Sequence, residues 1–233
     1  MENTRQETDK ETQNYSEKSV YDQNIIFWEN AWNMVKSPYT QLPNLGYLPR
    51  IPEIFSTQGA RKILDFGCGS GWLSVYLARQ GFEVIGVDVA AQAIKLAETW
   101  ALQEDLKIAF DVSDIASLTY ADASFDGIVA NSIFEHFTLS QAESMTRKVH
   151  DMLTPDGVFV GCFDKVGGGP GEYYTLPDGT HVYTDKARKG MLLRRFSKNE
   201  LTELFAHFAT VEMLTVDNES LMEIGRASCR ERV

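Results

Sequence analysis

The chain has 233 residues, of which 43% are hydrophobic, and a formal net charge of −11. This length suits one domain of ordinary size with room for a cap or an insertion. The acidic balance argues against a nucleic-acid surface, because phosphate binding needs clustered Lys and Arg. No apolar run approaches the ~20 residues of a membrane span. The polar N-terminus lacks the pattern of a signal peptide, so we expect a cytoplasmic protein with no membrane partner and reduced cysteines.

The first sixty residues divide into a polar and a more apolar segment. Residues 1–19 are rich in Glu, Thr, Gln, Asn and Lys. That composition cannot repay the entropy of ordering, so we expect a disordered polar arm. Residues 20–60 place Ile25, Trp28 and Trp32 near one helical face and continue with several prolines, which predicts an N-terminal helical cap. Two placements remain open: a helix packed on a sheet edge, or a lid over cofactor and substrate.

Residues 62–72 read Lys-Ile-Leu-Asp-Phe-Gly-Cys-Gly-Ser-Gly-Trp, and the rest of the chain is organised around them. The apolar run suits a strand buried on both faces of a parallel sheet. The glycines that follow carry no Cβ, so a ligand can approach the backbone of the loop. Apolar residues after Trp72 predict a helix. Its N-terminal N–H groups would then face the ligand.

Three more strands are predicted in the next sixty residues, over 83–89, 107–111 and 124–132, with a helix at about 90–103. Asp88 stands near the end of the first of these strands. A carboxylate there can accept hydrogen bonds from both ribose hydroxyls of an adenosine. Dinucleotide binders use the same position, so Asp88 by itself does not discriminate between cofactors.

The run Asp65-Phe66-Gly67-Cys68-Gly69-Ser70-Gly71 resembles motif I of the class I S-adenosylmethionine (SAM) dependent methyltransferases. A dinucleotide fingerprint would need a glycine where Trp72 stands. Further segments match the small-molecule branch (methyltransferase type 11/25-like): the acid at Asp88, a Phe-Asp run leading to Glu135-His136, and a Leu-x-Pro-x-Gly pattern from Leu153. The resemblance implies an α/β fold with a Rossmann-like, doubly wound, mostly parallel sheet, SAM as cofactor, and no metal.

The resemblance also implies a set of cofactor-binding residues. Asp111 would accept the exocyclic amine of adenine, and Val112 would supply a backbone contact. Asp114 stands in the same stretch, and either Asp111 or Asp114 can instead cap a turn or a helix. The full set is Asp65, Gly67, Cys68, Gly69, Gly71, Trp72, Asp88, Val89, Asp111, Val112, Asn131 and Ser132.

His136 is the candidate catalytic base, because it follows the fourth strand beside the expected methyl group. The alternative is a structural or substrate-contacting histidine. A base is needed where the acceptor must lose a proton. Aromatic residues could line the acceptor pocket or could be ordinary packing residues; they are Tyr21, Trp28, Tyr173, Tyr174, His181 and Tyr183.

The remaining elements follow in order. Ser140 with Glu143 predicts a capped helix, and residues 158–163 a fifth strand. An insertion over 165–195 contains the hairpin signal Pro-Asp-Gly-Thr from Pro177. Ser197 with Glu200 predicts a last capped helix, and residues 210–216 a sixth strand. The methyltransferase domain is thus expected over residues 61–222.

Residues 223–233 resemble the translation of a sequencing adapter, which would make them an artefact tail. They show no alternation of the kind a half-buried strand needs. We therefore expect them to form no paired strand, and the seventh strand of the fold to be missing through truncation.

The sequence predicts a SAM-dependent methyltransferase that moves a methyl group to a small-molecule acceptor by in-line displacement. Two alternatives remain open: an NAD(P)-dependent oxidoreductase on a similar fold, and a SAM-binding protein without catalysis.

Overall fold

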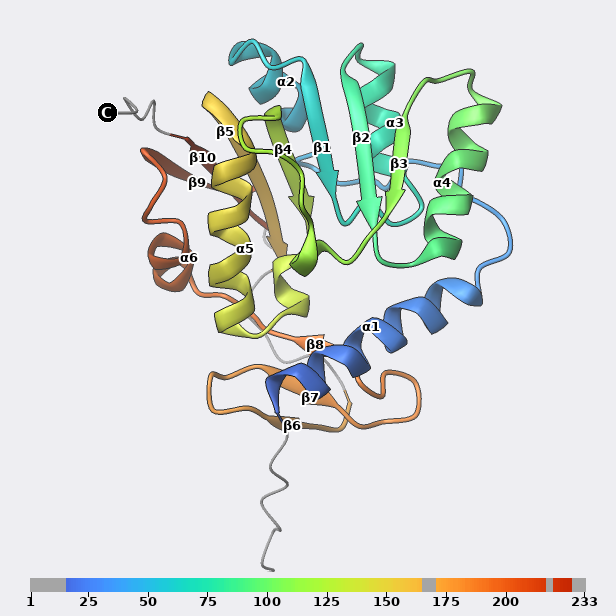
Figure 1. Ribbon diagram of the computed structural model, residues 1–233, viewed down its shortest axis with the longest axis vertical. Helices are drawn as coiled ribbons and strands as arrows, with labels where there is room; N and C mark the ends of the chain where they lie inside the picture. The colour runs from blue at the N-terminus through green and yellow to red at the C-terminus, as the bar shows by residue number, and fades with distance from the viewer. Residues whose placement is uncertain (1–15, 165–170, 217–219, 228–233) are drawn as a thin grey trace, which may run out of the picture.

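The computed structural model describes residues 16–164, 171–216 and 220–227. Its centre is a seven-stranded sheet (Figure 1). In spatial order the strands are β3 (Ala109–Val112), β2 (Glu83–Asp88), β1 (Lys62–Phe66), β4 (Phe125–Asn131), β5 (Leu153–Asp164), β10 (Ser220–Arg226) and β9 (Thr210–Val216). The first five are parallel, and β10 runs antiparallel to both of its neighbours. The predicted Rossmann-like, doubly wound fold is confirmed.

Successive residues of the central strands enter opposite cores, because side chains of a strand alternate between faces. Leu64 joins the core on the face of α5 (Leu139–Met152) and α6 (Lys198–Leu204). Its neighbour Ile63 joins the core on the face of α2 (Arg50–Thr57) and α3 (Trp72–Arg79). In Figure 1, α5 lies in front of the sheet and α3 behind it. Burial on both faces explains the continuous apolar strands of the sequence.

The helix termini depart from the sequence expectations at two places. α5 begins with a capping box formed by Thr138 and Gln141, so the predicted box at Ser140 and Glu143 is wrong by two residues. The first helix, α1 (Glu17–Asn33), begins inside the predicted polar arm, because Ser16 accepts a hydrogen bond from the Ser19 N–H and caps the first turn. The rest of that arm, residues 1–15, lies outside the described residues. At α6 the predicted capping box of Ser197 with Glu200 is confirmed.

The expectation of a missing seventh strand is wrong. β10 pairs with β5 from Ser220 to Arg226 and with β9 over the same residues. The hydrogen bonds between paired strands join backbone N–H and C=O groups, which every non-proline residue carries. A strand with a neighbour on each side can therefore pair without an alternating pattern of apolar and polar side chains. Gly225 suits the position, because a Cβ there would lie 2.8 Å from the Phe208 ring. The adapter resemblance of residues 223–233 stays an interpretation, since pairing is independent of a sequence's origin.

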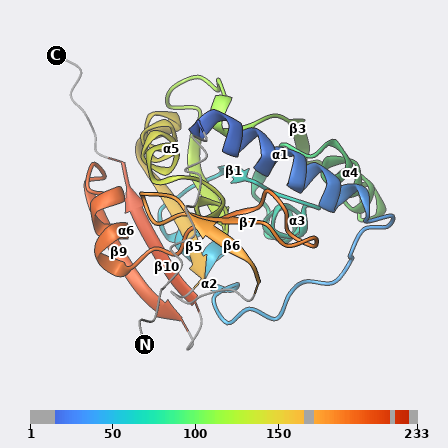
Figure 2. The same cartoon turned by 90° about the horizontal axis from the view of Figure 1, so that it is seen from below.

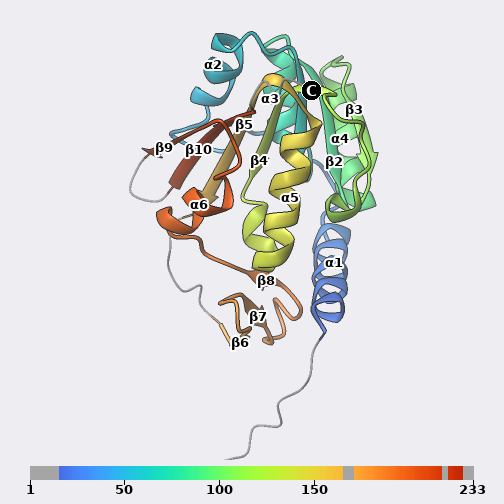
Figure 3. The same ribbon diagram turned by 60° about the vertical axis from the view of Figure 1, so that its left-hand side comes forward.

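The insertion forms a second, three-stranded sheet of β6 (Tyr173–Thr175), β7 (His181–Tyr183) and β8 (Leu192–Leu193). β6 and β7 are antiparallel, as the hairpin signal predicts. This small sheet and α1 lie side by side beyond the carboxyl ends of the parallel strands (Figures 1 and 3). Val20 of α1 packs with Val182 and Leu192 in a small core of their own.

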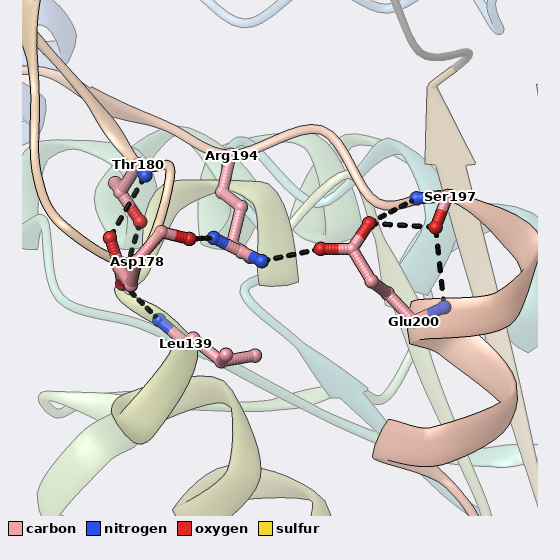
Figure 4. A network of polar contacts seen from close by, with 6 residues as sticks. All are labelled: Leu139, Asp178, Thr180, Arg194, Ser197 and Glu200. Atoms are coloured by element: carbon pink, nitrogen blue, oxygen red, sulfur yellow. Dashed lines mark hydrogen bonds and ion pairs between the residues drawn. The ribbon is translucent and has the colours of Figure 1, made fainter.

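A buried arginine, Arg194, belongs to a network of polar contacts that connects the insertion to α5 and α6 (Figure 4). Arg194 is 5% exposed, donates to the Asp178 carbonyl and pairs with Glu200 of α6 at 2.6 Å. Asp178 accepts a hydrogen bond from the Leu139 N–H at the start of α5, at 2.8 Å. The insertion is therefore fastened to the N-termini of two helices. None of the helices in the described ranges has the length and apolarity that crossing a membrane requires.

Candidate functional site

A cavity of about 280 Å³ lies at the carboxyl edge of the parallel strands, between the glycine loop and α1. An open parallel sheet places its ligands at this edge. Figure 2 looks at this edge from below, with α1 crossing in front of it. The lining residues are Tyr21, Asn24, Ile25, Trp28, Trp32, Gly67, Cys68, Gly69, Ser70, Trp72, Asp88, Val89, Asp114, Ile115, Asn131, Ser132, Ile133, His136 and Phe137.

Asp88 shapes the glycine loop as well as lining the cavity. Its Oδ2 accepts a hydrogen bond from the Gly69 N–H at 3.0 Å, and its Oδ1 accepts one from the Ala90 N–H at 2.9 Å. Burial raises the pKa of the Asp88 carboxyl, and these two N–H donors oppose the rise. Each carboxylate oxygen keeps a further lone pair with which a ligand hydroxyl can bond.

Two residues of the predicted cofactor set stand behind the loop rather than in the cavity lining. Asp65 is buried, accepts a hydrogen bond from the Ser74 hydroxyl at 2.5 Å, and has its pKa raised by burial to about 7. Gly71 is the N-cap of α3 with φ +80°, and a Cβ there would lie 2.7 Å from the Ala97 Cβ. Both residues hold the loop in place without touching the cavity.

The acid that reaches the cavity after β3 is Asp114, followed by Ile115. Asp111 instead accepts a hydrogen bond from the Tyr120 hydroxyl, and Val112 is 54% exposed. β3 ends at Val112, and the chain turns toward the cavity only after that residue. The pair that lines the cavity is therefore Asp114 with Ile115, three positions after Asp111 with Val112. An acid followed by an apolar residue occurs at both places, which is why the sequence pattern did not separate them.

One face of α1 forms the wall opposite the glycine loop. Tyr21, Ile25, Trp28 and Trp32 follow helical spacing and all line the cavity. The Tyr21 hydroxyl donates to Asp114, and burial followed by this bond raises the pKa of Tyr21. The Trp32 ring lies so close to the loop that a Cβ on Gly69 would be 2.9 Å from it. The first helix of the predicted cap thus forms one wall of the cavity.

His136 lies in the short helix η2 (Phe134–His136) directly after β4 and is half-buried. Its Nδ1 lies 2.9 Å from the Leu192 carbonyl oxygen. A carbonyl can only accept, so Nδ1 carries the proton and Nε2 keeps its lone pair. Burial lowers the pKa of His136, against the bond to Leu192, which raises it. Burial therefore favours the neutral form of this imidazole at the cavity.

Asn131 is the last residue of β4, Ser132 follows it although the predicted strand included it, and both residues line the cavity. The Asn131 side-chain oxygen accepts a hydrogen bond from the Tyr47 hydroxyl at 2.6 Å, which leaves the amide N–H groups for a ligand. Ser132 has φ +52°, a conformation that L residues seldom adopt, and its N–H donates to the Cys162 carbonyl at 2.8 Å.

The aromatic residues of the insertion do not line the cavity. Tyr173 stacks on His181 with ring centroids 4.0 Å apart, and the Arg188 guanidinium lies over the Tyr183 ring. Tyr174 packs against the small core of α1 and the insertion. These four residues thus pack within the small sheet and its adjoining core, while Tyr21 and Trp28 of the same predicted set line the cavity.

Several lining residues were absent from the predicted set: Asn24, Ile25, Trp32, Ser70, Asp114, Ile115, Ile133 and Phe137. Helical spacing from Tyr21 would have pointed to Ile25 and Trp32 once one face of the helix was assigned to the site. Asn24 gave no signal, because its contacts come from residues more than 100 positions away. In the described ranges, no group of three or more His, Cys, Asp or Glu side chains is arranged to hold a metal ion.

A family model described as a methyltransferase domain matches residues 63–157, from the first strand to the turn before the main part of β5. This match agrees with the resemblance of residues 65–71 to motif I of the class I SAM-dependent methyltransferases. SAM is the cofactor of this family. The donors and acceptors of the cavity fit it, since the carboxylates of Asp88 and Asp114 suit hydroxyl and amine groups of an adenosine.

Curated methyltransferases are similar over part of their length. A ubiquinone biosynthesis O-methyltransferase of Bartonella tribocorum is 33% identical over 150 residues, covering 60% of both chains. A 2-heptyl-1-hydroxyquinolin-4(1H)-one methyltransferase of Mycobacteroides abscessus is 30% identical over 99 residues, covering 42% of this chain and 44% of its own. The chain thus spans about three fifths of the length of the first of these relatives.

Solved structures share the fold. A protein of Pyrococcus horikoshii has a TM-score of 0.68 at 22% identity, covering 85% of this chain and 99% of its own. The 1,6-didemethyltoxoflavin-N1-methyltransferase of Burkholderia thailandensis, solved with S-adenosylhomocysteine, has a TM-score of 0.62 at 22% identity, covering 91% and 88%. At this identity the likeness concerns the methyltransferase fold.

Proposed function

We propose that this methyltransferase transfers the methyl group of SAM to a small-molecule acceptor by in-line displacement. The observation that carries the proposal is a cavity that joins the glycine loop, Asp88 and His136. SAM supplies a methyl group already activated on a sulfonium, so the protein has to align the reactants. Proximity and orientation are worth up to roughly 7–11 kcal/mol.

The cofactor's parts are matched by residues on successive strand ends. Asp88 would accept the ribose hydroxyls, and Asp114 with Ile115 would hold the adenine edge in place of Asp111 with Val112. The backbone of Gly67 to Gly69 would face the amino-acid part of SAM. The aromatic residues of α1 would lie near the sulfonium, where a ring face attracts a cation by ~0.5–2 kcal/mol.

His136 would act as the general base for an acceptor that loses a proton. The Nδ1–H donates to the Leu192 carbonyl, so the unprotonated Nε2 is the atom that can take the acceptor's proton. Burial keeps the imidazole neutral by lowering its pKa. A positioned base contributes about 10²- to 10⁴-fold to the rate.

The acceptor is proposed as a small molecule with a hydroxyl group, since the relatives in ubiquinone biosynthesis are named as O-methyltransferases. We further place the protein in the cytoplasm, where the buried thiols of Cys68 and Cys162 would stay reduced. Nucleic acid is not proposed as a partner, given the net charge of −11.

Calorimetry with SAM, S-adenosylhomocysteine and NADH tests the cofactor. We expect binding of the first two and none of NADH; tight NADH binding with no SAM binding would favour the oxidoreductase alternative. Release of S-adenosylhomocysteine in the presence of hydroxylated ring compounds tests catalysis, and separates an enzyme from a SAM-binding protein.

The role of His136 is tested with His136→Gln. We expect the turnover rate to fall at least about 100-fold with SAM affinity unchanged. The matched control is His181→Gln, since His181 stacks on Tyr173 in the insertion and does not line the cavity. Equal turnover in the two variants would exclude His136 as the base.

A further inference from the structure

Asn24 joins the helix over the cavity to two other elements. Its side chain is 3% exposed. Its Nδ2 donates to the His136 carbonyl at 2.9 Å, and its Oδ1 accepts a hydrogen bond from the Leu192 N–H at 3.0 Å. A buried amide with both ends bonded is oriented in one way, because reversing it would set donor against donor and acceptor against acceptor.

The same two residues meet each other through the imidazole. Leu192 presents its carbonyl to His136 Nδ1 at 2.9 Å. Asn24, Leu192 and His136 therefore form a closed ring of three hydrogen bonds. Trp28, one helical turn after Asn24, packs edge-on against the His136 ring with centroids 4.6 Å apart. α1 thus contacts His136 in three ways. Asn24 bonds to its carbonyl, Trp28 packs against its ring, and Asn24 also bonds to Leu192, whose carbonyl accepts from the imidazole.

β8 has a separate attachment that does not involve α1. The Arg194 N–H donates to the Glu135 carbonyl at 2.6 Å. The Arg194 side chain is fastened through Asp178 and Glu200 to the starts of α5 and α6, as Figure 4 shows. Loss of Asn24 would therefore leave β8 beside η2 while releasing the position of the Leu192 carbonyl relative to the imidazole.

We propose that Asn24 is a positioning residue that fixes the Nδ1–H tautomer of His136 when α1 lies over the cavity. This inference rests on the proposed function, in which Nε2 of His136 takes the acceptor's proton. With α1 in place, Asn24 fixes the position of Leu192 by accepting a hydrogen bond from its N–H. The Leu192 carbonyl then accepts a hydrogen bond from the Nδ1–H of His136, and Nε2 is left unprotonated. Without this contact the ring can protonate at Nε2 instead, and it then has no lone pair to offer the acceptor.

The test is the tautomer itself, read from long-range ¹H–¹⁵N spectra of the imidazole rings at a pH where histidine is neutral. In the wild type we expect His136 as the Nδ1–H form. In Asn24→Leu the ratio of Nδ1–H to Nε2–H should fall roughly 2- to 10-fold, the range set by the loss of one neutral hydrogen bond. The matched control Asn30→Leu makes the same change on the exposed face of α1 and should match the wild type.

An internal reference exists in the same spectra. His207 Nε2 lies 3.1 Å from the Thr146 carbonyl, so His207 should show the opposite tautomer, Nε2–H, in every variant. Because Asn24→Leu can weaken folding, Asn24→Ala serves as a second variant; it removes both hydrogen bonds of the amide and adds neither bulk nor charge beside His136. Its ratio should also fall.

An Nε2–H form of His136 in the wild type, or an unchanged Nδ1–H form in both Asn24 variants, would overturn the inference. Calorimetry with SAM on the same samples tests the proposed function separately. Absence of SAM binding together with the expected tautomer change would refute the proposed function and still support the role of Asn24.

Discussion

Replacing Asp88 by asparagine is the sharpest test of where the cofactor lies. The carboxylate accepts the Gly69 and Ala90 N–H groups and lines the cavity at 9% exposure. In Asp88→Asn the new side chain would keep the shape of the old one but would lose its charge. It would also present an amide N–H₂ to one of the two backbone donors.

The magnitude follows from the two hydrogen bonds that a ribose would make. Each hydrogen bond to a charged acceptor contributes about 1.5–3 kcal/mol, and asparagine keeps one of the two acceptor oxygens, so SAM binding should weaken by the value of about one such bond. Since about 1.4 kcal/mol is tenfold, the dissociation constant should rise roughly 10- to 100-fold. Orphaning one buried N–H should separately lower the free energy of unfolding by about 1–3 kcal/mol.

Titration calorimetry with SAM measures the first effect, and urea unfolding of the same protein measures the second. Asp111→Asn is the matched control, because this acid bonds to Tyr120 outside the cavity. Its dissociation constant should stay within about twofold of the wild type. A folded Asp88→Asn protein that binds SAM with wild-type affinity would refute the placement of the ribose at Asp88.

Three other predictions concern stability. Gly71→Ala should lower the melting temperature by at least about 4 °C, because φ is +80° and the new Cβ would meet Ala97 at 2.7 Å; Gly81→Ala, at φ +91° with nothing within 4 Å, is the control and should lose less. Burial raises the pKa of Glu135 from 4.5 to about 7, so this group's contribution to folding is present at low pH and is lost as pH rises from 4.5 to 7, by about 3 kcal/mol; unfolding of Glu135→Gln at pH 5 and pH 8 should show a smaller fall than the wild type, and equal falls would contradict this sign. Truncation after Met222 leaves three of the seven paired positions of β10 and should lower the melting temperature by at least about 5 °C; an unchanged value would show that the strand contributes little.

The sequence alone was enough for the elements whose signals are local. The glycine loop between an apolar strand and a helix, the acid ending β2, the hairpin turn after Pro177 and the capping box at Ser197 all lie where the pattern predicted them. Each signal depends on residues within a few positions of one another. Steric and hydrogen-bonding rules at that range act in the same way in any fold.

Tertiary structure decided which residues meet. Asp111 and Asp114 are both acids beside an apolar residue, and the end of β3 selected Asp114. Residues 223–226 have no strand pattern, and they pair because β5 and β9 lie on either side of them. Asn24 carries no motif, and it holds His136 and Leu192 because α1 crosses the carboxyl edge of the sheet. The Asn24 contacts join residues more than 100 positions apart, and the energy of all these contacts depends on a geometry that exists only once the chain has folded.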